Sequence, residues 1–112
     1  MRHLYYAGNS VLLADVTCKA LLRYARALAE AGKSDIASVP VITEGGSRAY
    51  AHILIGPASQ LFSTPVPDSS DEPVDAEVIL EMERLTRQLL PGTPAWPMEM
   101  IDVDSTDYDL EL

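Results

Sequence analysis

The feature that most constrains the fold is a helical pattern at residues 15–31, which separates two pairs of strand-like runs. Apolar residues recur along it at spacings of three and four, beginning with Val16 and Ala20, as is typical of a helix with one buried face. Asp15 stands where an N-cap is expected, and Gly32 follows as a left-handed C-terminal stop. We therefore expect one helix here, with a β-hairpin on each side.

Short apolar runs bounded by turn residues predict the strands. They are residues 4–7, 11–13, 36–43, 48–55 and 59–64. The first two flank a turn cluster at residues 8–10, and the next two flank Gly45 and Gly46, so each pair predicts a hairpin. Pro40 lies inside the third run and has no backbone N–H, which predicts an edge strand or a bulge there.

A second helix is expected at residues 74–90, after a linker at residues 65–73 that contains three prolines. Glu83 and Arg87 are spaced to form an ion pair on it. The element order is then β-β-α-β-β-β-α, which indicates an α+β fold: a mostly antiparallel sheet with both helices packed on one face. The profilin-like and roadblock-like folds have a comparable order.

The domain division follows from the same reading. Residues 1–92 form a single domain, and residues 93–112 form a C-terminal tail in which acidic and apolar residues alternate. The chain has no signal-peptide pattern and only one Cys, so a cytoplasmic location is expected. Its uncharged stretches are too short and interrupted to span a bilayer, so no membrane association is expected.

Charge is distributed unevenly along the chain. Residues 1–67 hold six bases and four acids, whereas residues 68–112 hold two bases and thirteen acids. The formal net charge of −9 therefore combines a body at +2 with a C-terminal third at −11. Such a chain is a poor candidate for binding nucleic acid.

Two groups of residues are candidates for interaction. Lys19, Arg23 and Arg26 share one face of the first helix, which is either a solvated face or a docking surface for an acidic partner such as the tail. The tail candidates are Trp96, Met98, Met100, Ile101 and Tyr108. They pack on their own domain, add to a second copy, or bind another protein as a short linear motif.

The sequence predicts no catalytic, metal-binding or cofactor-binding set. We expect Cys18 to be a small core residue, and two histidines are too few to specify a metal site. A pocket between sheet and helices is the alternative, with polar tips from tyrosines and a histidine. The candidates for it are Tyr24, Tyr50 and His52, with Tyr5 and Tyr6 in addition.

Residues 54–60, Leu-Ile-Gly-Pro-Ala-Ser-Gln, follow an Ala-rich helix and a hairpin. In this the chain resembles a family of small, uncharacterised actinobacterial proteins, and the resemblance implies no active residue. We expect a small non-enzymatic interaction or assembly domain that forms a homodimer. The alternative is a small-molecule-binding or enzymatic domain.

Overall fold

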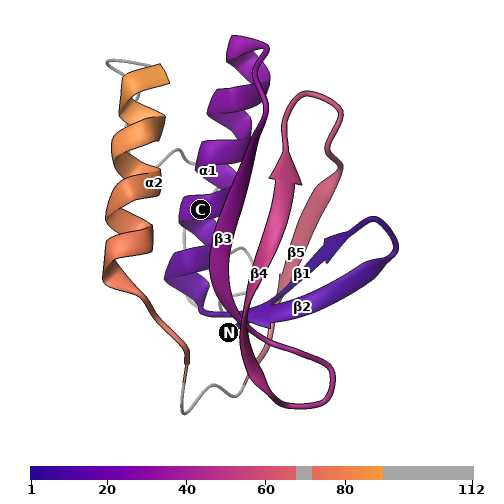
Figure 1. Ribbon diagram of the computed structural model, residues 1–112. Coiled ribbons are helices and arrows are strands. Elements are labelled where there is room, and N and C mark those ends of the chain that lie inside the picture. Colours follow the sequence, from indigo (N-terminus) through magenta and orange to yellow (C-terminus); the bar gives the residue numbers. More distant parts are fainter. Residues whose placement is uncertain (68–71, 90–112) are drawn as a thin grey trace, which may run out of the picture.

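The computed structural model describes residues 1–67 and 72–89, which form an α+β fold with a five-stranded antiparallel sheet and two helices. Its elements are β1 (Arg2–Tyr6), β2 (Asn9–Leu13), α1 (Asp15–Ala31), β3 (Asp35–Ile42), β4 (Arg48–Ile55), β5 (Leu61–Pro65) and α2 (Ala76–Leu89). Both helices lie on the same side of the sheet, with α2 alongside α1 (Figure 1). The predicted tail, residues 93–112, lies outside the described residues, and so do residues 68–71 of the predicted linker. The domain division therefore stays a prediction.

The sheet has the strand order β4-β3-β2-β1-β5 and consists of two arms. One arm is the β3–β4 hairpin, and the other is formed by β2, β1 and β5. The arms are joined where Leu12 pairs with Ile42. Elsewhere along β3 the paired strand is β4, so Pro40 lies in a stretch with one ladder partner, as its missing N–H predicts.

The core lies between the sheet and α1. Alternate residues of the strands point toward the helices, and Leu4, Val39 and Ile55 are almost fully buried there. Leu21 of α1 packs in the same cluster, and Met82 joins it from α2. The two helical patterns therefore bury most of their apolar faces, whereas Val16, predicted on the buried face of α1, is 46 % exposed.

Both ends of α1 can be explained by their backbone groups. Gly32 adopts a left-handed conformation with φ of 68° and closes the helix, as predicted. At the other end the N-cap is Ala14, not Asp15, which is the first helical residue. A carboxylate oxygen of Glu72 accepts the backbone N–H of Asp15 at 3.3 Å, so the helix N-terminus is capped from a distant segment.

Helix α2 begins later than the sequence predicted. It starts at Ala76, and a carboxylate oxygen of Asp75 accepts the backbone N–H of Glu77 at 3.1 Å, as an N-cap does. Pro73, the last residue of the predicted linker, is buried ahead of the helix. The local cap of Asp75 decides where the helix begins.

The β1–β2 turn is also shifted from its predicted place. Ala7 and Gly8 form the two-residue turn, with φ of 53° and 85°. Two positive φ angles are characteristic of a type I′ turn, whose twist matches that of a hairpin. Ala7, predicted as a strand residue, takes the first position of this turn.

Candidate functional site

One face of the sheet points away from the core, and we call it the open face. Cross-strand partners share a face, so Ile36 and its partner Leu54 lie together, on the opposite face from buried Val39. The open face comprises His3, Tyr5, Ser10, Leu12, Ile36, Ser38, Pro40, Ile42, Arg48, Tyr50, His52, Leu54, Phe62 and Thr64.

The open face exposes large apolar side chains. Ile36, Tyr50, Leu54 and Phe62 have exposed fractions of 63, 56, 54 and 59 %. A single exposed apolar residue needs no explanation, but several on one face are typical of a surface that meets another molecule. These four side chains make the open face the first candidate for a binding surface.

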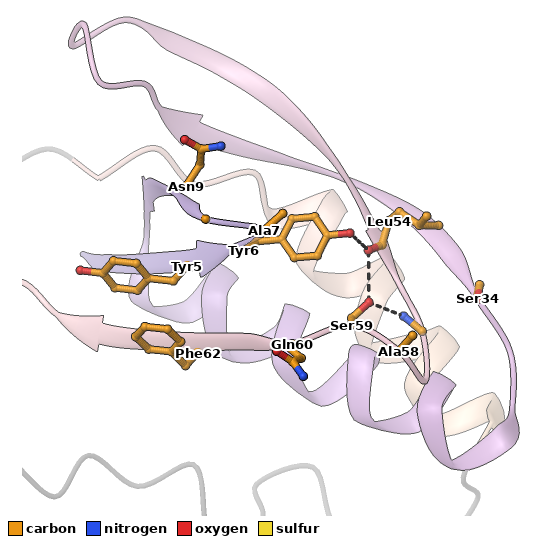
Figure 2. A pocket seen from close by; sticks show the side chains of 12 residues that line it. Tyr5, Tyr6, Ala7, Asn9, Ser34, Leu54, Ala58, Ser59, Gln60 and Phe62 are labelled. Atoms are coloured by element: carbon orange, nitrogen blue, oxygen red, sulfur yellow. Dashed lines mark hydrogen bonds between the residues drawn. The ribbon is translucent and has the colours of Figure 1, made fainter.

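A hollow of about 640 Å³ lies at the end of the open face where the two arms separate (Figure 2). We call it the arm hollow. It is lined by residues from the β1–β2 hairpin, the end of β4, the loop after β4 and the start of β5. They are Tyr5, Tyr6, Ala7, Gly8, Asn9, Ser34, Leu54, Gly56, Ala58, Ser59, Gln60 and Phe62.

Aromatic rings form one wall of the arm hollow. Tyr5 and Phe62 are cross-strand partners on β1 and β5, and their rings stack with centroids 4.4 Å apart and planes 9° apart. Figure 2 shows the Tyr6 ring extending from β1 toward β4. The Tyr6 hydroxyl donates to the carbonyl oxygen of Leu54 at 2.7 Å and so connects the two arms.

The loop after β4 forms the opposite rim and is held by short contacts. The Ser59 hydroxyl accepts the backbone N–H of Gly56 at 3.0 Å and donates to the carbonyl oxygen of Leu54 at 3.3 Å. Gly56 packs closely on the segment after α1, because a Cβ at this position would lie 2.5 Å from the Ser34 hydroxyl. The rim is therefore held by the Ser59 hydroxyl and by the close packing of Gly56 on Ser34.

The arm hollow carries no charged side chain among its twelve lining residues. Its polar groups are hydroxyls, amides and backbone atoms, which can orient a bound group by hydrogen bonds. Its chemistry suits an apolar or aromatic group that brings hydrogen-bonding atoms of its own.

The predicted cationic face of α1 is only partly available. Lys19 pairs with Asp15 at 3.4 Å, and Arg26 pairs with Glu30 at 2.9 Å, as their spacing predicts. Arg23 differs from the expectation: it is buried and pairs with Glu83 of α2 at 3.0 Å. The acidic partner of Arg23 is thus a residue of the second helix.

The pairing of Glu83 also overturns a prediction on α2. We expected Glu83 to pair with Arg87 on the same helix, whereas it pairs with Arg23 across the interface between the two helices. Burial of Arg23 lowers the pKa of its guanidinium, and Glu83 acts in the opposite direction. A contact between elements has replaced the local one that the spacing favoured.

The structure does not bring the predicted pocket residues Tyr24, Tyr50 and His52 into one cavity. Tyr24 is buried and donates to a carboxylate oxygen of Asp35, while burial and that carboxylate raise the pKa of Tyr24. Tyr50 is exposed and donates to Asp75 at 2.8 Å. His52 is exposed on the open face.

A smaller hollow of about 390 Å³ lies where α2 meets the start of β3, and Tyr24 lines it. It also holds four carboxylate residues: Asp35, Asp75, Glu77 and Glu81. Among the described residues, no group of three or more His, Cys, Asp or Glu is placed to hold a metal ion. This smaller hollow is an acidic surface without a ligand set.

Cys18 is a core residue, as predicted. Its side chain is fully buried, and burial raises the pKa of the thiol to about 11. At neutral pH the thiol is therefore protonated and a poor nucleophile.

The tail candidates Trp96, Met98, Met100, Ile101 and Tyr108 all lie outside the described residues. Sequence reasoning named Tyr5 and Tyr6, which do meet at the arm hollow, but it missed Leu54 and Phe62. Leu54 could have been found from the alternation in residues 48–55, because this alternation places Leu54 on one face with Tyr50 and His52.

Within residues 1–67 and 72–89, no helix is long and apolar enough to cross a membrane. Comparisons with models of known families, with curated proteins and with solved structures find no match. The resemblance to actinobacterial proteins therefore stays a prediction, and the inference of function rests on the structure.

Proposed function

We propose that this protein is a small, non-enzymatic protein-interaction domain that assembles as a homodimer through its open face. One observation carries the proposal: Ile36, Tyr50, Leu54 and Phe62 are each more than half exposed on a single sheet face. Burying such side chains against a second copy removes apolar area from water, which is the main favourable term in association.

The position of the face agrees with this function. The opposite face of the sheet is covered by α1, with α2 packed beside α1 (Figure 1). Within residues 1–67 and 72–89, no helix covers the open face. Closed homodimers with a two-fold axis use the same patch on both subunits. Rigid aromatic side chains such as Tyr5, Tyr50 and Phe62 are enriched in the centres of such patches.

The test is the dissociation constant of the dimer, measured by sedimentation equilibrium, for a matched pair of variants. Leu54→Glu places a charge on the open face, whereas Leu80→Glu makes the same change on α2, where Leu80 is 63 % exposed. We expect Leu54→Glu to weaken dimerisation at least about tenfold, or about 1.4 kcal/mol, and Leu80→Glu to have little effect. A monomeric wild-type protein, or equal effects of the two variants, would contradict the proposal.

A second candidate function is the binding of a small molecule in the arm hollow. Its volume of about 640 Å³ falls within the range of ligand pockets, and it is lined by aromatic residues. The test is the fluorescence of an uncharged apolar dye. Binding that is lost in Phe62→Ser but kept in Leu80→Ser would support this function, and equal binding by both variants would contradict it.

A further inference from the structure

Residues 94–112 contain two short stretches with the pattern of a strand that buries one side. Trp96, Met98 and Met100 alternate with other residues, and so do Tyr108, Leu110 and Leu112. The positions between the second set are Asp107, Asp109 and Glu111. Successive side chains of an extended chain point to opposite sides, so each stretch presents an apolar side, and the second also presents an acidic side. Between the two stretches the alternation changes register, because Ile101 and Val103 fall on the other side from Trp96.

The open face matches this segment in chemistry. None of its strand residues is Asp or Glu, and it includes Arg48, His3 and His52. Asp75 reaches it at Tyr50, whose hydroxyl donates to this carboxylate. The arm hollow at its end has no charged lining and is walled by aromatic rings. An apolar side that carries a Trp can be buried there, with its acidic side turned to solvent.

The hollow beside α2, which borders the open face at Ile36 and Ser38, does not match. The hollow beside α2 holds Asp35, Asp75, Glu77 and Glu81, and residues 90–112 hold six acids and no base. Placing these like charges together is unfavourable, because each carboxylate raises the energy of its neighbours. The same repulsion disfavours contact with the acidic surface of α2.

The segment is long enough to reach the open face of a second copy. Twenty-three residues follow Leu89, and an extended chain covers about 3.3 Å per residue, or about 76 Å in all. The described part of the molecule is 39 Å across in its longest direction. Length therefore does not limit an exchange between two copies.

We propose that, in the homodimer, residues 94–112 of each copy pack on the open face of the other, with Trp96 in the arm hollow. This rests on the proposed function and names the segment that makes the contact. Each copy then gives one segment and receives one, which satisfies two-fold symmetry. The dimer interface combines a folded surface with a segment that the partner supplies.

Trp96 is the single Trp of the chain, so its fluorescence reports on this segment alone. We expect its emission to shift to shorter wavelength, and its quenching by acrylamide to fall, as the concentration rises through the dimer dissociation constant. A dimer in which acrylamide quenches Trp96 as strongly as in the monomer would overturn the inference and leave the proposed function standing. A protein that is monomeric throughout would overturn the proposed function itself.

A mixing experiment separates exchange between copies from packing within one copy. A Leu54→Glu chain keeps its Trp but has a damaged hollow, and a Trp96→Phe chain has an intact hollow but no Trp. We expect the emission of the first chain to shift to shorter wavelength when the second is added. Leu80→Glu in place of Leu54→Glu is the matched control, and its emission should already be shifted. A buried Trp96 that responds neither to dilution nor to mixing would show packing within one copy and contradict the proposal.

Discussion

At the scale of single residues, Ala7 shows how a turn adjacent to the arm hollow is built. Its φ of 53° places a residue with a Cβ in the left-handed region, which costs about 1 kcal/mol or more relative to Gly. Asn tolerates this region far better, and Asn-Gly is the favoured pair of a type I′ turn.

Replacing Ala7 by Asn should therefore stabilise the hairpin. We expect the free energy of unfolding of Ala7→Asn to rise by about 0.5–1 kcal/mol, measured by urea denaturation. The matched control is Gly8→Ala, which puts a Cβ at φ of 85° and should lower the same quantity by about 1 kcal/mol. No gain in Ala7→Asn would show that the turn is not under this strain.

Cys18 predicts a specific dependence of stability on pH. Burial raises the pKa of its thiol from 9.0 to about 11, so the folded protein holds this proton more tightly than the unfolded chain does. The stability from this group is fully present below about pH 9 and is lost as the pH rises to about 11.

The Cys18→Ala variant has no thiol and so lacks this pH-dependent contribution to stability. We expect the difference in free energy of unfolding between wild type and variant to shrink by about 2 kcal/mol from neutral pH to about pH 11, since one pKa unit is worth about 1.4 kcal/mol. Urea denaturation at a series of pH values measures it. A difference that stays constant would mean that the thiol titrates normally in the folded protein.

At the scale of elements, the pair of helices is held by one buried ion pair as well as by apolar packing. Arg23 of α1 is buried, and Glu83 of α2 lies 3.0 Å from its guanidinium. Removing the carboxylate leaves a buried charge without this partner, whereas replacing Arg23 by an apolar side chain of similar length removes the charge itself.

The two variants should therefore differ in cost. We expect Glu83→Gln to lower the free energy of unfolding by about 2–3 kcal/mol and Arg23→Met to lower it by less. In Arg23→Met, adding Glu83→Gln should then cost little, which thermal or urea unfolding of the double variant measures. Additive losses in the double variant would show that the two side chains are not coupled.

The elements also show what the sequence could predict. The helix that ends at Gly32 and the two hairpins follow from local periodicity and turn chemistry, which act within a few residues. The cap on α1 from Glu72 and the partner of Glu83 could not be predicted, because each joins residues more than fifty positions apart. The same holds for the arm hollow, which depends on where β2 and β3 separate.

At the scale of the whole molecule, part of the uneven charge is balanced within the fold. Glu72 pairs with the amino group of Met1, and Glu83 pairs with Arg23, so two acids of the C-terminal third bind the basic body. The open face carries no Asp or Glu on its strands, and Asp75 is bound there by the Tyr50 hydroxyl. It is the apolar side of an otherwise acidic protein.

The central claim is that the open face is where two copies meet. Hydrogen exchange read by mass spectrometry over a dilution series tests it most directly, because protection of each segment reports whether it is covered. We predict that exchange in β4 and β5 speeds up as the protein is diluted, while exchange in α2 does not change. Exchange that is independent of concentration in β4 and β5, or a change confined to α2, would contradict the account.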